Sequence, residues 1–263
     1  MNETRNKEQV IVSLTSFPAA IPYVVPTVES LLRGSVLPDK IVLYLTYSQF
    51  GDEGLPKDLL TLSEENPIFE IRNYNRDIRS YRKLVPALRD FPEAVIVTVD
   101  DDVAYDKDML RDLLRLHTQY PEYVLAHRAK RIVPGKPYKK WSKLRWYHFL
   151  GGKIKHSCNI IQTGVGGVLY PPHSLLPEMI DEELFTKIAP TTDDIWFWAA
   201  AVANGRMVMP FPYGLHNKPK GLGKPKELSL KSVNFKSGSD RNDNAFKAIL
   251  AKYPIVGERL QQM

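Results

Sequence analysis

Three adjacent carboxylates, Asp100, Asp101 and Asp102, directly follow the apolar run Ala94–Val99. In an extended chain alternate residues point the same way, so Asp100 and Asp102 can serve one ligand together. Hard oxygen ligands suit Mg²⁺ or Mn²⁺, which take one or two carboxylates and complete their shell with substrate phosphates. Three neighbouring negative charges also repel one another unless a cation or hydrogen-bond donors offset them. The run therefore indicates either a divalent-cation site or an acidic turn at a helix start, where the helix dipole favours carboxylates.

A second acidic pair, Asp193 and Asp194, follows Thr191 and Thr192. One interpretation is a capped helix start with acidic residues in its first turn. The other makes Asp194 a general base that takes a proton from an acceptor hydroxyl. His216 also has two interpretations, a partly buried structural histidine or a neutral imidazole that completes a metal site.

Alternating strand and helix patterns position these residues. The β-branched run Val10–Thr15 predicts a buried first strand, Thr27–Gly34 a helix that ends at its glycine, and Lys40–Thr46 a second strand. Ala94–Val99 is apolar at both odd and even positions, so both of its faces are expected to be buried, as in a central strand. This alternation predicts an α/β fold with a mainly parallel central sheet and helices on both faces. Ligands bind beyond the carboxyl ends of such strands, which is where Asp100–Asp102 lie.

The rest of the chain is expected to continue this alternation. The further elements expected are helices near Lys57–Leu62, Leu84–Arg89, Asp106–His117, Asp181–Lys187, Asp193–Asn204 and Asn244–Tyr253, and strands at Ile68–Ile71, Asn159–Tyr170 and Met207–Met209. The segment His127–Lys155 holds ten Lys or Arg and no Asp or Glu, and predicts a partly irregular excursion that carries function. Its Trp141, Trp146 and Tyr147 either belong to a minor core or stack on a bound ligand. The basic segment Asp77–Lys83 either begins a surface helix or holds a phosphate or a base.

The composition is typical of one large folded domain: 263 residues, 43% hydrophobic and 25% charged, which excludes a disordered or fibrous chain. A net charge of +6 favours anionic partners, namely nucleic acid, acidic lipid surfaces or phosphorylated small molecules. The single cysteine, Cys158, excludes an internal disulfide and makes the cytoplasm the expected location. The polar start lacks a secretory signal, and the longest apolar run, Ile195–Ala203, is too short to cross a membrane. Any membrane contact is therefore expected to be peripheral.

Five segments, taken in order, resemble those of GT-A-fold glycosyltransferases of bacterial surface-polysaccharide synthesis, of the family-2 type. They are Val12–Pro18, Asp77–Lys83, Thr98–Val103, Thr163–Tyr170 and Asp193–Trp196. The similarity covers about residues 9–217. It implies a GT-A-like, Rossmann-type sandwich in a single domain of residues 1–263. Within it, a nucleotide-binding half would span about 9–105, a sugar- and acceptor-binding half about 106–217, and a basic C-terminal segment 218–263.

The resemblance also implies roles for single residues. Those expected around a nucleotide-sugar donor are Thr15, Ser16, Asp77, Tyr81, Lys83, Asp100, Asp101, Gly166 and Gly167. The expected ligands of a divalent metal, Mn²⁺ or Mg²⁺, are Asp102, Asp100 and His216. The expected catalytic residues are Asp194 and Asp193. The family usually has Glu at the first position of this pair, so which of the two aspartates is catalytic stays open.

The expected function is metal-dependent transfer of a sugar from a nucleotide diphosphate sugar to a saccharide or lipid-linked acceptor, in the cytoplasm or at the inner face of the membrane. Such transfer builds negative charge on the leaving diphosphate, which a divalent cation and basic residues stabilise. One alternative, a sugar nucleotidyltransferase, is disfavoured because Thr15–Ala20 is not a glycine-rich, basic loop. The other is a non-catalytic polyanion-binding module. Basic residues concentrate in His127–Lys155 and His216–Lys247, which flank the glycine-rich segment and the acidic pair, so nucleic acid is not the expected partner.

Overall fold

A seven-stranded sheet forms the centre of the computed structural model, which describes residues 8–149, 156–211, 218–228 and 240–261. In spatial order its strands are β11 (Val208–Pro210), β6 (Val124–Ala126), β10 (Val168–Tyr170), β4 (Val95–Thr98), β1 (Val10–Thr15), β2 (Lys40–Leu45) and β3 (Phe69–Asn73). β1 pairs in parallel with β2 and β4, β2 with β3, and β11 with β6. Only β10 runs antiparallel to its neighbours in this sheet. The predicted mainly parallel central sheet is confirmed.

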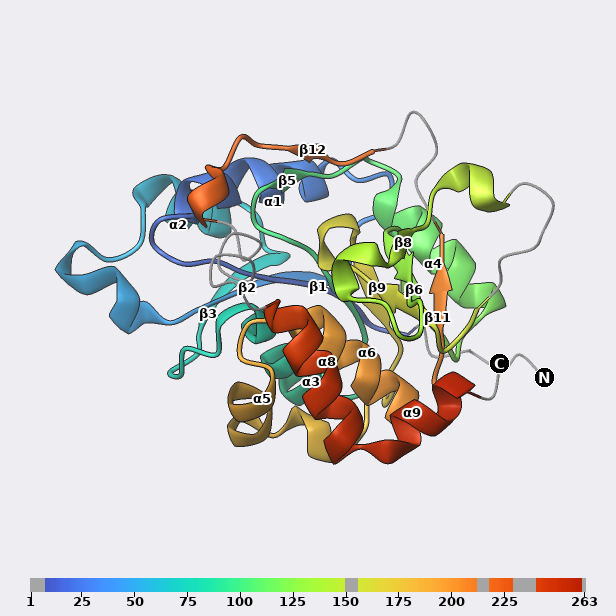
Figure 1. Cartoon of the computed structure of the whole chain (residues 1–263). Coiled ribbons are helices and arrows are strands. Elements are labelled where there is room, and N and C mark those ends of the chain that lie inside the picture. Colours follow the sequence, from blue (N-terminus) through green and yellow to red (C-terminus); the bar gives the residue numbers. More distant parts are fainter. Residues whose placement is uncertain (1–7, 150–155, 212–217, 229–239, 262–263) are drawn as a thin grey trace.

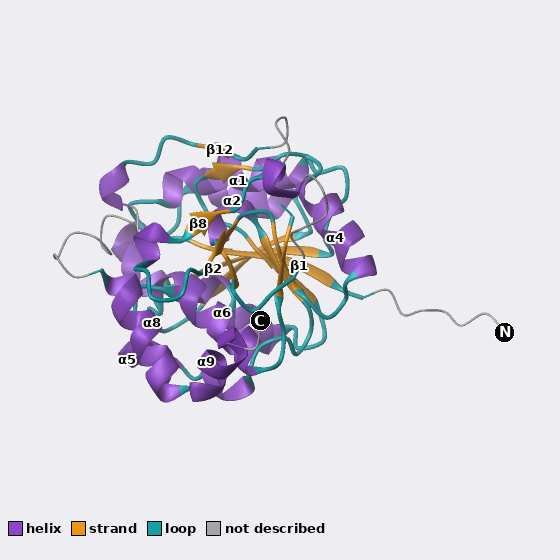
Figure 2. Ribbon diagram, turned by 45° about the vertical axis from the view of Figure 1, so that its right-hand side comes forward, coloured by secondary structure: helices purple, strands orange, loops and turns teal. Residues whose placement is uncertain are grey.

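Helices cover both faces of this sheet, as predicted (Figures 1 and 2). On one face lie α1 (Val24–Leu32), α2 (Lys57–Glu65) and α4 (Met109–Gln119). On the other lie α3 (Val85–Asp90), α5 (Glu182–Ile188), α6 (Asp193–Ala203), α8 (Arg241–Lys252) and α9 (Pro254–Gln261). Strand residues alternate between the two cores: Val10 and Val12 of β1 enter the first, and Ile11 enters the second. This explains why the strands are apolar on both parities.

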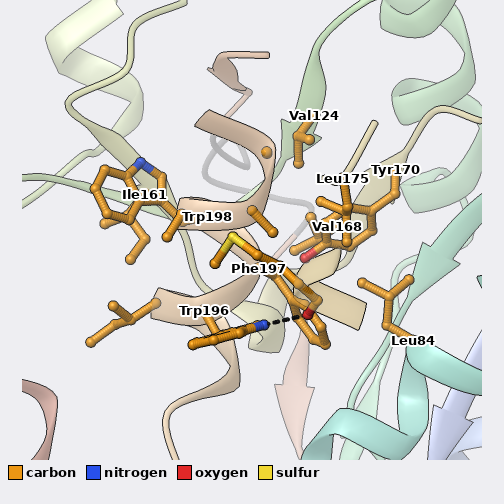
Figure 3. Close-up of a cluster of buried hydrophobic side chains, with 14 of the residues drawn as sticks. Leu84, Val124, Ile161, Val168, Tyr170, Leu175, Trp196, Phe197 and Trp198 are labelled. Carbon is orange, nitrogen blue, oxygen red and sulfur yellow. Dashed lines mark hydrogen bonds between the residues drawn. The ribbon is translucent and has the colours of Figure 1, made fainter. Parts of the chain in front are cut away.

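The second core fixes α6 in place (Figure 3). Trp196 and Trp198 are fully buried there, together with Tyr170 of β10. The indole N–H of Trp196 donates to the carbonyl of Met179 at 2.7 Å, and that of Trp198 to the carbonyl of Cys158 at 2.9 Å. A buried indole N–H usually finds such an acceptor, and these two hydrogen bonds help to orient the rings in the core. The N-terminal residues of α6 therefore have a defined position.

The segment Asn159–Tyr170 is not the single strand that the sequence predicted. It forms β9 (Ile160–Gln162) and β10, joined by a 3-10 turn over Gly164–Gly166 and by Gly167, whose φ is +87°. The two strands belong to different sheets, because β9 pairs with β7 (Ala129–Arg131) in a three-stranded antiparallel sheet completed by β8 (Ser142–Lys143). Glycine adopts this left-handed backbone readily, so the glycine run redirects the chain rather than bulging one strand.

Two smaller features complete the arrangement. The expected final helix is followed by a second one, α9, because Tyr253 leaves the helical conformation and Pro254 starts a new helix. β12 (Lys220–Gly221) pairs antiparallel with β5 (Val103–Ala104), which brings the basic C-terminal segment to the acidic turn. Within the described ranges, no helix is long and apolar enough to cross a membrane.

Candidate active site

The carboxyl ends of β1 and β4 meet at one edge of the large sheet. The two strands pair in parallel with Ser13 opposite Thr98, and the N–H of Val99 donates to the carbonyl of Ser13 at 3.1 Å. Beyond this pair the chain turns through Asp100–Asp102 after β4 and through Ser16 after β1. The acidic turn therefore lies at the edge where ligands bind in open parallel sheets, as its sequence position predicted.

The three carboxylates of the turn have different partners. The Asp101 side chain is only 9% exposed and accepts a hydrogen bond from Ser16 Oγ at 2.5 Å. Lys224 Nζ lies 3.0 Å from Asp101 Oδ1 and 2.9 Å from Asp102 Oδ2. Burial raises the pKa of Asp101, while Lys224 and the Ser16 hydroxyl oppose that shift. Asp101 is thus held by the protein, whereas Asp100 and Asp102 are 26% and 23% exposed and can reach a ligand.

The buried ammonium of Lys83 joins the acidic turn to the start of α6. Its Nζ lies 3.1 Å from Asp100 Oδ1 and 3.2 Å from Asp193 Oδ2. Burial alone would lower the pKa of Lys83, but Asp100, Asp193 and Asp194 together raise it well above its ordinary value. Lys83 therefore stays charged, and the two acidic motifs of the sequence belong to one site.

Asp194 is the partly exposed member of the acidic pair, and Asp193 is the buried one. Asp194 Oδ1 accepts a hydrogen bond from the N–H of Gly164 at 3.1 Å. Burial, then the charges of Asp193 and Asp100, raise the pKa of Asp194 to about 7, although Lys83 and the Gly164 N–H act against the shift. A carboxylate with this pKa can accept a proton near neutral pH, which suits a general base.

Arg82 forms hydrogen bonds at the carboxyl ends of β1 and β2, a role that the sequence did not reveal. Its side chain is 2% exposed, and its guanidinium donates to Thr15 Oγ1 at 2.7 Å, to the Ser16 carbonyl at 2.5 Å and to Thr46 Oγ1. The half-exposed Asp77 lies 3.8 Å from it. Burial lowers the pKa of Arg82. Thr15 and Ser16 are therefore positioned beside the turn through Arg82, and Asp77 lies at the rim of the same region.

Tyr81 has no exposed surface that a nucleotide could contact, which corrects its expected role there. Its ring is fully buried and stacks on Phe185 with centroids 4.1 Å apart, and its hydroxyl donates to the Ala189 carbonyl at 2.6 Å. Residues 79–83 form a 3-10 helix, in which successive side chains point in different directions. Tyr81 consequently enters the core, while its neighbours Arg82 and Lys83 face the site.

The glycine that faces the carboxylates is Gly164, not Gly166 or Gly167. A Cβ at Gly164 would lie 2.6 Å from Lys83 Nζ and 3.2 Å from Asp100 Oδ1. A Cβ at Gly166 would instead meet the Cβ of Arg128 at 2.9 Å, and one at Gly167 the sulfur of Met109 at 3.1 Å. Contact of Gly166 and Gly167 with a donor sugar therefore stays a prediction, since their close approaches here are to the chain itself.

A divalent cation fits this turn only together with phosphate oxygens. The Lys224 ammonium already occupies a cation position between Asp101 and Asp102, so the turn accepts positive charge there. Among the described residues, no group of three or more His, Cys, Asp or Glu side chains is arranged to hold a metal, and His216 lies outside those residues. Asp100 and Asp102 supply two hard oxygen ligands, and Mg²⁺ or Mn²⁺ can complete its shell with phosphates.

Structures of known proteins share this fold. A mannosyltransferase from Pyrobaculum calidifontis, PcManGT, solved in complex with GDP-Man and Mn²⁺, matches 98% of this chain and 75% of its own, with a TM-score of 0.55 and 14% identity. Residues 1–349 of S. aureus TarS match over 76% of this chain and 58% of that one, with a TM-score of 0.51 and 19% identity. No protein-family model and no curated protein matches the sequence. At these identities the similarity shows the fold, a GT-A-like Rossmann-type α/β sandwich.

The fit of Gly164 against Lys83 predicts a strong effect of a single methyl group. Gly164→Ala requires the Lys83 ammonium to move. Because this ammonium is buried between Asp100 and Asp193, the shift disturbs both ion pairs and is expected to destabilise the protein by about 1–3 kcal/mol. Denaturant unfolding measures the difference. Gly221→Ala is the matched control because a Cβ at Gly221 has no neighbour within 4 Å. Equal stability of the two variants would contradict the geometry.

The raised pKa of Asp194 predicts a pH-dependent stability difference. A carboxyl has an ordinary pKa of about 3.9 in the unfolded chain, and in the fold this one is raised to about 7. Between these values the folded state binds more protons, so wild-type stability falls as pH rises, and the full cost is present above pH 7. Asp194→Asn should remove this cost and gain on the order of 1–2 kcal/mol relative to wild type between pH 4 and pH 8.

Urea unfolding at four pH values checks this expectation, with the exposed Asp52→Asn as control. A stability difference between Asp194→Asn and wild type that does not change with pH would show that Asp194 titrates normally.

Proposed function

We propose that this chain is a nucleotide-sugar-dependent glycosyltransferase that moves a sugar to a saccharide or lipid-linked acceptor. The observation that supports this most directly is the position of Lys83, 3.1 Å from Asp100 and 3.2 Å from Asp193. Lys83 thereby holds the acidic turn Asp100–Asp102, whose carboxylates could bind a cation and a diphosphate, close to Asp194. Asp194 is partly exposed and has a raised pKa. Sugar transfer needs these two groups, one for the leaving diphosphate and one for the attacking hydroxyl.

On the donor side, the diphosphate would bind at the exposed carboxylates of the acidic turn. A divalent cation held by Asp102 and Asp100 would neutralise the negative charge that grows on the leaving diphosphate. Lys224 adds a positive charge at the same place, 2.9 Å from Asp102. Thr15, Ser16 and the rim residue Asp77 would then border the nucleoside. The GDP-Man and Mn²⁺ bound by PcManGT support a metal-dependent nucleotide-sugar donor for a protein of this fold.

On the acceptor side, Asp194 would take the proton of the attacking hydroxyl. The hydroxyl oxygen forms a bond to the anomeric carbon, the bond from that carbon to the diphosphate breaks, and the leaving oxygen keeps the electron pair. Asp193 is buried and paired with Lys83, so we assign it a positioning role and the base to Asp194. The charge of Asp193 also contributes to the raised pKa of Asp194.

The pathway and the cellular location of the reaction are also part of this proposal. We place the reaction in the synthesis of a surface polysaccharide, at the cytoplasmic side, with peripheral membrane contact through basic residues. The sequence similarity of the five segments supports this setting, together with the basic stretches that flank the site.

A nucleotide screen tests the donor site. UDP, GDP, ADP and CMP, each with and without Mn²⁺, are added to the full chain, and the unfolding temperature is measured. One diphosphate should raise it, more so with Mn²⁺, because a ligand that binds only the folded state stabilises it by mass action. Asp102→Asn should abolish the Mn²⁺-dependent part of the shift while the protein stays folded.

Asp52→Asn removes an exposed carboxylate outside the acidic turn and should behave as wild type. Stabilisation by none of the four nucleotides, or an unchanged Mn²⁺ effect in Asp102→Asn, would overturn the donor site.

Hydrolysis of the donor by water tests the base without knowledge of the acceptor. With the nucleotide sugar whose base binds best, Asp194→Asn should reduce the rate by about 10²–10⁴, the usual contribution of a general base. Binding of the nucleoside diphosphate with Mn²⁺ should remain, because the Asn side chain keeps an acceptor for the Gly164 N–H. A wild-type hydrolysis rate in Asp194→Asn would assign the base to another residue.

A further inference from the structure

Three basic residues lie on and next to the small sheet. Lys130 of β7 lies directly opposite Lys143 of β8 in the antiparallel pair, and cross-strand partners point to the same face of a sheet. Arg128 lies in the bend that immediately precedes β7. Like charges directly opposite each other destabilise a sheet, so this arrangement costs free energy unless negative charge offsets it.

The described part of the chain supplies little such charge. None of its carboxylates forms an ion pair with Arg128, Lys130 or Lys143, and residues 127–155 contain no Asp or Glu. Lys130 Nζ instead lies over the Tyr138 ring, 3.4 Å from its centroid. Burial, then the charges of Lys143 and Arg128, lower the pKa of Lys130 to about 8, even though Asp194 and Asp240 act to raise it. Positive charge is therefore in excess here.

Arg128 is connected to Asp194 by two consecutive hydrogen bonds. The N–H of Thr163 donates to the carbonyl of Arg128 at 2.9 Å, and the N–H of the next residue, Gly164, donates to Asp194 Oδ1 at 3.1 Å. Asp194 is also close enough to influence the charge of Lys130. The segment that carries the basic residues is thus linked to Asp194 through the backbone of Thr163 and Gly164. Lys83, in the 3-10 helix of residues 79–83, contacts Asp193 instead.

We propose that Arg128, Lys130 and Lys143 form an acceptor subsite that binds an anionic group, a phosphate or a carboxylate, on the substrate whose hydroxyl Asp194 activates. This proposal rests on the proposed glycosyltransferase function. The guanidinium of Arg128 can bind either group with two parallel hydrogen bonds, and the two ammonium groups add charge. The donor diphosphate is already provided for by the acidic turn with Lys224, on a different sheet. An uncharged acceptor would leave the opposed lysines uncompensated.

Calorimetric titration of the full chain with small probes tests the subsite. The proposed donor site is first saturated with Mn²⁺ and the nucleoside diphosphate that stabilises wild type best. Glycerol 1-phosphate and glucuronate are the anionic probes, and glycerol and glucose are their uncharged counterparts. At least one anionic probe should bind saturably and the uncharged probes should not, and the stronger anion identifies phosphate or carboxylate as the ligand.

Paired variants locate the binding. Lys130→Gln with Lys143→Gln should weaken the anionic probe by about tenfold or more, since a hydrogen bond to a charged group contributes about 1.5–3 kcal/mol. Lys139→Gln with Lys140→Gln removes the same charge from two exposed lysines of the same segment and should leave the affinity unchanged. Each variant is first shown to be folded by its unfolding transition.

Two results would overturn the subsite: no saturable binding of either anion to wild type, or equal weakening by both double variants. Failure of the subsite and failure of the proposed function are distinguishable, because nucleoside diphosphate binding is measured separately for each variant. If wild type binds no nucleotide, the proposed function fails, and titration of the anions alone still reports on Arg128, Lys130 and Lys143.

Discussion

The candidate site depends on one buried charge, the ammonium of Lys83. It contacts Asp100 after β4 and Asp193 at the start of α6, so it ties the edge of the large sheet to the helix that carries Asp194. Removing one partner of a buried ion pair leaves a charge without compensation and typically costs about 3–5 kcal/mol. The carboxylates and Lys83 therefore stabilise one another. They thereby connect the acidic turn to the start of α6.

The need to compensate buried charge also explains how three adjacent aspartates can coexist. Asp100 turns to Lys83, Asp101 to Ser16 and Lys224, and Asp102 to Lys224. The repulsion within the turn is thus offset by lysines from two remote parts of the chain. The run does not begin a helix, because β5 follows it directly, and its role as a divalent-cation site stays a prediction. Because Lys224 comes from the segment after β12, the C-terminal part of the chain belongs to the site rather than to a separate basic tail.

The hydrophobic patterns of single segments were sufficient to predict the central strands and the acidic turn. The strands Val10–Thr15 and Ala94–Val99 are apolar on both parities because two cores flank the sheet, so their position and the acidic turn at the sheet edge were predictable. Contacts between distant segments were not. Tyr81 looked like part of a basic loop, and only the packing of Phe185 shows that its ring is in the core. Of the glycines after β9, Gly164 was overlooked because its constraint is the Lys83 ammonium, which no sequence pattern places beside it.

The distribution of charge links the fold to the proposed chemistry. The buried lysines next to the acidic turn, Lys83 and Lys224, each contact two carboxylates, which offset the positive charge that each lysine brings to the site. The opposed pair Lys130 and Lys143 at the small sheet has no such balance within the described chain. The excess behind the net charge of +6 therefore lies in part on the small sheet, where the charge of Asp194 acts on Lys130. A diphosphate donor bound at the acidic turn does not by itself require basic residues on the small sheet. An anionic acceptor bound beside Asp194 would require them.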